Sequence, residues 1–231
     1  LGAPSREVDF TVPTGNFGDI FAGYVAKRMG LPVRRLRIAA NINDILARTL
    51  KTGIYEVKQV HATTSPSMDI QISSNFERLL FEATGRDSAV IRALMGSLSQ
   101  SGRFVLSDAV LKQVREDFDA GRADETETSA AIRAAWREAG ELVDPHTAVA
   151  LAVADQDKPV STVPNIVLST AHAAKFPDAV EAACGVRPQL PAWLDGLMTK
   201  SEHIKVMKND QADVERFILS VSRAAKQGIA G

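Results

Sequence analysis

The sequence predicts an α/β protein with a mostly parallel sheet and a helical insertion. Two observations support this fold class. Short apolar stretches typical of buried strands alternate with amphipathic helical stretches near both ends of the chain, whereas the middle shows helical periodicity only. Because strand–helix–strand order favours right-handed crossovers, the alternating parts are expected to contain parallel strands. We therefore expect an α/β domain at 1–85 and 141–231, interrupted by a helical insertion at 86–140.

The first expected elements are a strand and a helix joined by a turn. Apolar and polar residues alternate from Val8 to Val12, which is typical of a short strand. Apolar residues within 20–29 fall on one half of a helical wheel, and Gly30 followed by Pro32 supplies a stop signal. This order places a turn between a strand end and a helix start.

A second strand and helix are expected directly afterwards. The apolar run 36–40 suits a buried strand. Asn41 or Asn43 is expected to cap a helix that continues through Leu50 and stops at Gly53.

From residue 75 to about residue 140 the chain shows helical periodicity only. The apolar stripes lie within 76–81, 89–98, 110–118 and 131–139. Asp124, Glu125 and Glu127 precede the last stripe, and we interpret them as the acidic first turn of a helix rather than as a metal site.

The alternating pattern resumes after residue 140. Asp144 and Pro145 are expected to be the N-cap and first residue of a helix over 145–155, which is apolar nearly all round and so buried. The remaining expected elements are a strand at 165–168, a helix at 173–183 ended by Gly185, and an amphipathic helix carrying Val214, Phe217, Ile218 and Val221.

Composition excludes several classes of protein. With 231 residues, 27 Lys and Arg against 28 Asp and Glu, and 45% apolar residues, the chain resembles ordinary soluble globular proteins and lacks the basic excess of most nucleic-acid binders. The longest nearly apolar run, 147–154, is far short of the roughly 18 residues that a membrane span needs. We expect the single cysteine, Cys184, to be an inert thiol, and the lack of a second cysteine favours a reducing, cytoplasmic location. The four histidines show no metal-ligand spacing, so we expect no metal site.

The turn at 14–19 has the features of a phosphate-binding loop. Gly15 and Gly18 permit positive φ and close backbone approach, so that consecutive N–H groups can converge on one anion. A helix that starts near Asp19 adds its partial positive charge. The loop has neither the Lys-Ser/Thr pair of a Walker A motif nor the spacing of a dinucleotide fold. A tight turn without a ligand is the alternative interpretation.

This loop and five further segments resemble threonine synthases, which are pyridoxal-phosphate (PLP) enzymes. The segments match the family in the same order, and their joint order is more specific than any one of them. They are VPTGNFGDI at 12–20, ANINDIL at 40–46, HATTSPSMDI at 61–70, SSNFERLL at 73–80, DPHTA at 144–148 and LSTAHAAKF at 168–176.

The resemblance implies a three-layer fold of the PLP-dependent, tryptophan-synthase-β-like type and the conversion of O-phospho-L-homoserine and water into L-threonine and phosphate. It also implies that PLP is the cofactor and that its phosphate meets the loop backbone. Thr170 matches the hydroxyl residue that contacts the pyridine nitrogen, and Asp19 would order the loop or bind through its N–H. The implied cofactor-binding residues are Gly15, Asn16, Phe17, Gly18, Asp19 and Thr170.

The Schiff-base lysine of this family lies in a Ser-Phe-Lys-Asp-like segment well before the glycine loop, and no such segment occurs here. Position 1 is Leu rather than Met, so we expect this chain to be the C-terminal part of a longer enzyme and inactive by itself. The catalytic lysine is then expected before Leu1, and no catalytic residue is expected in the chain. Lys175 lies nearest a matched motif but is expected on the surface.

The remaining expectations concern substrate and partners. Asn75 and Arg78 have two interpretations. Either Asn75 belongs to an N-terminal helix cap and Arg78 forms a surface pair, or both help to orient the cofactor or the substrate phosphate, with bidentate contacts from the guanidinium. His146 is expected to be structural. The expected partners are O-phospho-L-homoserine and the N-terminal part of the same enzyme, with no nucleic acid and no membrane; the oligomeric state is left open. Two alternatives stay open: a phospho-lyase relative of threonine synthase, and a non-catalytic binding domain on a PLP scaffold.

Overall fold

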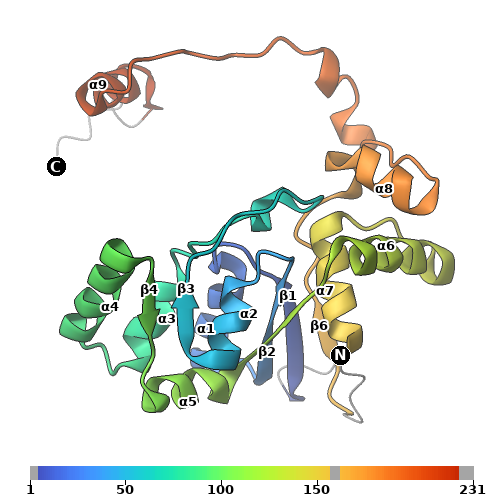
Figure 1. The fold of residues 1–231 in the computed structure, drawn as a ribbon. Helices are drawn as coiled ribbons and strands as arrows, with labels where there is room; N and C mark the ends of the chain where they lie inside the picture. Colours follow the sequence, from blue (N-terminus) through green and yellow to red (C-terminus); the bar gives the residue numbers. More distant parts are fainter. Residues whose placement is uncertain (1–4, 157–161, 224–231) are drawn as a thin grey trace. The chain divides into compact units, whose positions relative to one another are not determined.

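The computed structural model describes residues 5–156 and 162–223. The chain divides into two compact units, Leu1–Gln189 and Leu190–Gly231. The first unit contains a four-stranded parallel sheet in the order β5-β2-β1-β6 (Figure 1). Its strands are β1 (Val8–Pro13), β2 (Val33–Ala40), β5 (Phe118–Arg122) and β6 (Asn165–Val167). The predicted α/β class with a mostly parallel sheet is confirmed.

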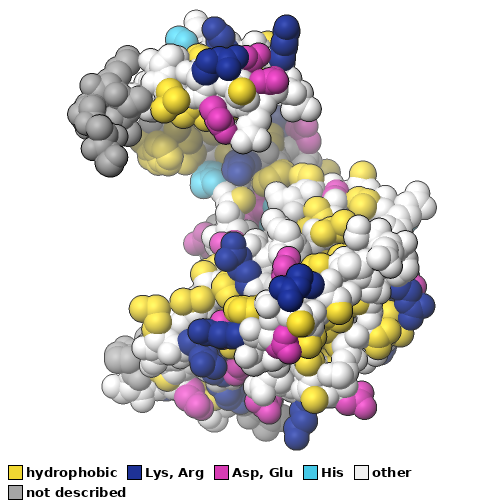
Figure 2. All heavy atoms as spheres, turned by 90° about the vertical axis from the view of Figure 1, so that its left-hand side faces the viewer, with side chains coloured by type: hydrophobic (Ala, Val, Ile, Leu, Met, Phe, Trp, Pro, Cys, Tyr) yellow, Lys and Arg dark blue, Asp and Glu magenta, His cyan; other side chains and the backbone are white. Residues whose placement is uncertain are grey.

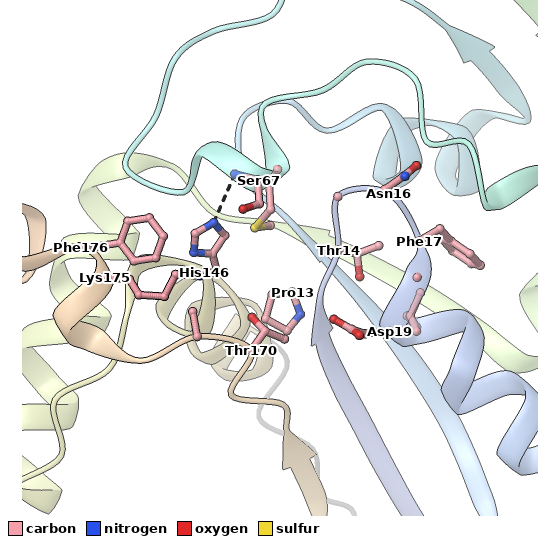
Figure 3. A pocket seen from close by; sticks show the side chains of 15 residues that line it. Pro13, Thr14, Asn16, Phe17, Asp19, Ser67, His146, Thr170, Lys175 and Phe176 are labelled. Carbon is pink, nitrogen blue, oxygen red and sulfur yellow. Dashed lines mark hydrogen bonds between the residues drawn. The ribbon is translucent and has the colours of Figure 1, made fainter. Parts of the chain in front are cut away.

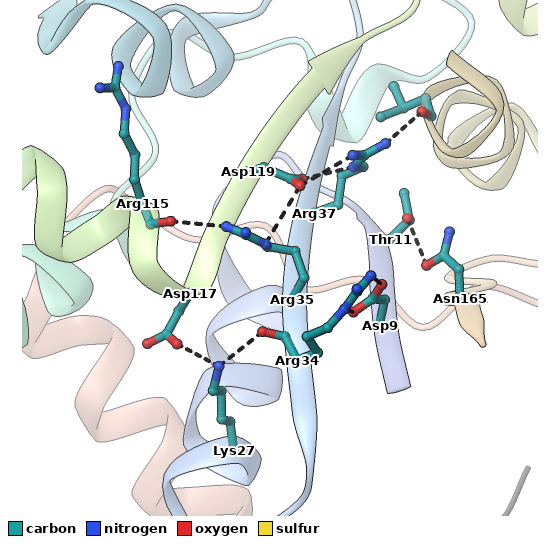
Figure 4. Close-up of polar contacts among 11 residues, drawn as sticks. Asp9, Thr11, Lys27, Arg34, Arg35, Arg37, Arg115, Asp117, Asp119 and Asn165 are labelled. Atoms are coloured by element: carbon teal, nitrogen blue, oxygen red, sulfur yellow. Dashed lines mark hydrogen bonds and ion pairs between the residues drawn. The ribbon is translucent and has the colours of Figure 1, made fainter. Parts of the chain in front are cut away.

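Charged side chains join neighbouring strands of this sheet (Figure 4). Arg37 and Asp119 are register partners on β2 and β5, and the guanidinium donates to both carboxylate oxygens at 2.8 and 3.2 Å. On the other side of β2, Arg34 donates to Asp9 of β1 at 2.9 Å. Such cross-strand pairs support one register, because a slip of one residue would move every side chain to the opposite face.

The sheet is covered on both faces, which makes a three-layer fold. Successive side chains of a strand point to opposite faces. On β2, Leu36 and Ile38 belong to the cluster that contains residues of α1 (Gly18–Arg28), whereas Ala39 packs with Val149 and Ala150 of α7 (Pro145–Gln156). The apolar helix predicted at 145–155 is confirmed as buried.

Helix α2 (Ile45–Thr52) follows β2 and ends at Gly53, which has the positive φ of a helix stop. The predicted cap is wrong, since Asp44 occupies the N-cap position. Asn41 and Asn43 are instead buried, and their side-chain amides donate to a carboxylate outside the helix. The sequence pattern could not distinguish a local cap from a long-range contact of the same side chain.

The expectation of helices alone between 75 and 140 is wrong at two places. The helices are α3 (Phe76–Ala83), α4 (Ser88–Ser101), α5 (Asp108–Asp117) and α6 (Glu125–Ala139). Between them, β4 (Arg103–Val105) pairs with β3 (Ile54–Glu56), and β5 joins the central sheet. The division into an α/β domain and an insertion at 86–140 stays a prediction, but the range contributes a strand to the sheet. Asp124 and Glu127 form the predicted first turn as a reciprocal capping box.

The elements after β6 are short. The helix predicted at 173–183 is present as η2 (Ala173–Lys175) and α8 (Pro177–Cys184), with Gly185 at its end. Cys184 is half-buried, and its thiol donates to the carbonyl of Val180 at 3.2 Å.

The second unit contains η3 (Ala192–Leu194), η4 (Leu197–Thr199) and α9 (Gln211–Val221). The predicted amphipathic helix is confirmed as α9, and the ammonium of Lys205 lies 5.3 Å from the ring centre of its Phe217. No helix among residues 5–156 and 162–223 is long and apolar enough to cross a membrane. Figure 2 shows basic and acidic side chains intermixed on one face of the molecule, in keeping with the formal net charge of −1.

Candidate functional site

A cavity of about 320 Å³ lies where β1 ends and α1 begins, beside the segment that follows β6 (Figure 3). This is the carboxyl edge of the parallel strands, where open α/β sheets bind ligands. All six predicted cofactor-binding residues line the cavity. The full lining consists of Pro13, Thr14, Gly15, Asn16, Phe17, Gly18, Asp19, Ile20, Ser67, Met68, His146, Thr170, Ala171, Lys175 and Phe176.

The loop that lines this cavity has backbone N–H groups without acceptors in the described part of the chain. Thr14 donates to the carbonyl of Ala39, and Phe21 donates to the carbonyl of Phe17. Among the described residues, the backbone N–H groups from Gly15 to Ile20 meet no acceptor. Those from Gly18 to Ile20 belong to the first turn of α1, where the N–H groups have no partner within the helix and lie at its positive end. We call the backbone of residues 15–20 the cradle; it has the donors that a phosphate requires.

Residues 73–75, which we call the anchoring segment, donate hydrogen bonds to two carbonyls of the cradle and to the side chain of Asn16. The hydroxyl of Ser73 donates to the carbonyl of Gly15 at 2.8 Å, and the side-chain amide of Asn75 donates to the carbonyl of Asn16 at 2.9 Å. The N–H and hydroxyl of Ser74 both donate to the side-chain oxygen of Asn16. Because the carbonyls of Gly15 and Asn16 accept these hydrogen bonds, they do not compete with an anion for the N–H donors of the cradle.

Asn75 and Arg78 do not line the cavity. Arg78 donates to the side-chain oxygen of Asn75 at 3.0 Å, and both residues line a separate hollow that also includes Phe21. Asn75 occupies the N-cap position of α3 without a capping hydrogen bond from its side chain. The described contacts therefore give Asn75 a role in holding the cradle.

The predicted positive φ of the loop occurs at a different residue. Phe17 has φ 63° and ψ 17°, whereas neither Gly15 nor Gly18 has positive φ. Gly15 serves the other expected purpose, close approach, because a Cβ there would lie 2.4 Å from the carbonyl oxygen of Ser67. The Phe17 ring is fully buried between Phe76 and Phe118, with ring centres 5.4 and 5.6 Å away.

Ser67 and Met68 line the cavity from the segment 63–69, which is held by a partly buried polar cluster. One carboxylate oxygen of Asp69 accepts from the amides of Asn41 and Asn43 and from the hydroxyl of Thr63, at 2.7 to 3.0 Å. The other accepts from the N–H of Thr63 at 2.8 Å. This cluster fixes the 63–69 segment against the end of β2, and so fixes the cavity wall.

His146 connects this wall to α7. The N–H of Ser67 donates to Nε2 of His146 at 3.3 Å, and Nδ1 lies 2.7 Å from a carboxylate oxygen of Asp144. Because Nε2 accepts, the proton of the neutral ring is on Nδ1 and is donated to Asp144. Burial alone would raise the pKa of Asp144, but hydrogen bonds from His146 and Thr147 hold it below its usual value. The structural role expected for His146 fits these contacts, although its position on the cavity wall was not foreseen.

Lys175 was expected on the surface, and its side chain is indeed exposed, yet it also lines the cavity. Its ammonium lies 5.9 Å from the ring centre of Phe176. Within the described ranges, no group of three or more His, Cys, Asp and Glu residues is arranged to hold a metal ion. The cavity lining therefore brings together the cradle backbone, the hydroxyl residue Thr170 after β6 and the ammonium of Lys175.

Comparison with known proteins identifies relatives over nearly the whole chain. The family model "Threonine synthase, C-terminal" matches residues 147–218. A threonine synthase of Pseudomonas aeruginosa is 45% identical over 219 residues, which are 94% of this chain and 47% of the relative. The crystal structure of PLP-bound threonine synthase from Brucella melitensis is 59% identical with a TM-score of 0.88, covering 97% of this chain and 48% of that one. The yeast threonine synthase structure is 38% identical with a TM-score of 0.82, covering 94% and 48%. The chain thus spans about half the length of the curated relatives it matches.

Proposed function

We propose that this chain, which matches threonine synthases over about half of their length, belongs to that family and forms the cofactor-phosphate side of a threonine synthase. The proposed reaction converts O-phospho-L-homoserine and water into L-threonine and phosphate, with phosphate leaving from Cγ and water adding at Cβ. Bound PLP would supply the electron sink for this chemistry.

One observation carries the proposal: the residues from Gly15 to Ile20 line a cavity, their N–H groups have no acceptor among the described residues, and the carbonyls of Gly15 and Asn16 accept hydrogen bonds from the anchoring segment. In our proposal the N–H groups of residues 15–19 hold the cofactor phosphate. The positive end of α1 contributes to the same binding. The PLP-bound Brucella relative, which matches nearly all of this chain, supports the same cofactor.

Asp19 and Thr170 would act in different ways. A carboxylate beside a phosphate is unfavourable, so Asp19 binds through its N–H or orders the loop. Thr170 lies on the opposite side of the cavity from Asn16 and Phe17 (Figure 3). Its hydroxyl can donate to an unprotonated ring nitrogen without protonating it, which sets how strongly the cofactor withdraws electrons.

We assign the Schiff-base lysine to the part of threonine synthases that this chain does not match, and we propose that the chain alone is inactive. A cytoplasmic location belongs to the same proposal. The substrate carboxylate would also be bound outside the matched half.

The test uses the protein expressed from its full reading frame and supplied with PLP and O-phospho-L-homoserine. We expect phosphate and threonine in equal amounts. Phosphate without threonine would refute the proposal in favour of a phospho-lyase relative. A protein that takes up no PLP and releases no phosphate would favour a binding domain without catalytic function.

A further inference from the structure

We propose that Lys175 forms a second anion subsite in the cavity, which takes the phosphate group of the substrate. This inference rests on the proposed function, because it assumes that the cradle is occupied by the phosphate of the cofactor. A substrate with its own phosphate then needs a separate positive group. Lys175 supplies that group from the opposite wall.

The position of Lys175 is the first argument. Among the lysines that the structure describes, it is the one that lines the cavity. Lys175, Phe176 and His146 lie on one side, across from Asn16 and Phe17 of the cradle (Figure 3). The cavity therefore has positive character at two separate places, the backbone donors of the cradle and this ammonium.

The second argument is that the ammonium is available. Within the described part of the chain, no carboxylate lies within the 4.0 Å ion-pair distance of Lys175. Asp19, the one carboxylate that lines the cavity, is not paired with it. The ring of Phe176 packs near the ammonium at 5.9 Å, which limits its positions without neutralising its charge.

The third argument excludes His146 as the positive group. Its Nε2 already accepts a hydrogen bond from the N–H of Ser67, and its Nδ1 proton is already donated to Asp144. A cationic His146 would have to give up the Ser67 contact, because both ring nitrogens would then be donors. On the side of the cavity formed by His146, Lys175 and Phe176, the cation is therefore Lys175, whose ammonium has three N–H donors for phosphate oxygens.

The experiment measures binding of inorganic phosphate to the PLP-loaded protein from the full reading frame. PLP content is determined first, and because the cofactor phosphate then fills the cradle, added phosphate reports on the second subsite. We expect Lys175→Met to weaken phosphate binding about tenfold by calorimetry, since a hydrogen-bonded charge at a solvent-exposed site contributes at the low end of its range. Lys175→Arg should stay within about threefold, because it keeps the charge. Lys112→Met, exposed on α5 and outside the cavity, is the matched control and should bind as wild type.

A second titration identifies the group that Lys175 binds. Lys175→Met should weaken binding of O-phospho-L-homoserine about tenfold and leave binding of L-homoserine unchanged. Equal weakening of both ligands would show that Lys175 binds the carboxylate, and would overturn the assignment to phosphate.

The outcomes separate this inference from the proposed function. Unchanged phosphate binding in a PLP-loaded Lys175→Met protein would overturn the subsite alone. Loss of PLP from that variant would place Lys175 in the cofactor site and would also overturn the subsite. A wild-type protein that takes up no PLP would overturn the proposed function and this inference together.

Discussion

Replacing Gly15 by alanine tests the geometry of the cradle most directly. A Cβ at position 15 would lie 2.4 Å from the carbonyl oxygen of Ser67 and 3.3 Å from the Cα of Met68. Both are backbone atoms, so no side-chain rotation relieves the contact, and the two segments must separate until the first distance reaches at least 3.0 Å. The part-buried hydrogen bonds of Asp69 oppose that movement. Overpacking of this kind costs about 1–3 kcal/mol.

We therefore expect Gly15→Ala to lower the free energy of unfolding by about 1–3 kcal/mol in urea titrations. PLP should also bind more weakly, because the cradle shifts with the loop. Gly18→Ala is the matched control in the same loop: a Cβ there meets nothing within 4 Å, its φ is not positive, and alanine favours the helix that begins at this residue. Its unfolding free energy should be unchanged or higher. Equal stability losses in the two variants, or none at Gly15, would refute the close-approach argument.

Three further predictions concern the anchor of the cradle, the buried Asp144 and an ion pair of the sheet. Asn75→Ala should weaken PLP binding about fivefold in equilibrium titrations, because it frees a cradle carbonyl, whereas Arg78→Ala should bind PLP as wild type; equal losses would contradict this. Hydrogen bonds that Asp144 accepts lower its pKa despite its burial. Its ionised form therefore stabilises the folded state at pH values above the ordinary pKa of 3.8, and this contribution is lost as the pH falls through the lowered pKa. Asp144→Asn should thus be less stable than wild type at neutral pH, with a gap that narrows in acid in urea midpoints measured against pH; a constant gap would contradict the argument. A double-mutant cycle of Arg37→Ala and Asp119→Ala should give a coupling energy of about 0.5–1 kcal/mol that decreases with salt, and a coupling near zero at low salt would rule out a stabilising pair.

The parts of the fold that were predictable from sequence are those whose signal is local. The strand at β1, the start of α1 and the buried helix α7 each follow from periodicity and from stop or cap residues in the same stretch. Strand β5 was missed because its stability depends on a distant partner. Its residues Phe118 and Asp119 take their places opposite Leu36 and Arg37 of β2, about eighty positions earlier in the chain. A five-residue segment that contains Asp, Gly and Arg carries little strand propensity of its own.

The same limit applies to the candidate site. The sequence indicates the loop at 14–19 because glycine, turn and helix start are adjacent in the chain. Asn75 was considered a possible ligand residue, yet its amide is bound to a cradle carbonyl that lies 59 positions earlier. For Lys175 the sequence predicts only a surface position, because a single lysine carries no local signal for a cavity. Such side-chain roles depend on which loops meet in the folded chain, and local sequence patterns carry no information about that.

Phe17 shows how the core supports the shape of the cradle. Left-handed backbone costs a non-glycine residue about 1–2 kcal/mol, and the same loop contains Gly15 and Gly18, which could adopt it freely. Full burial of a phenylalanine contributes about 1.5–3 kcal/mol, and each favourable aromatic pair adds about 0.5–1.5 kcal/mol. The contacts of Phe17 with Phe76 and Phe118 therefore offset the backbone cost. Because the ring is anchored in the core, the N–H groups on either side of it are held in place before any anion arrives, which a more flexible glycine at this position would not achieve.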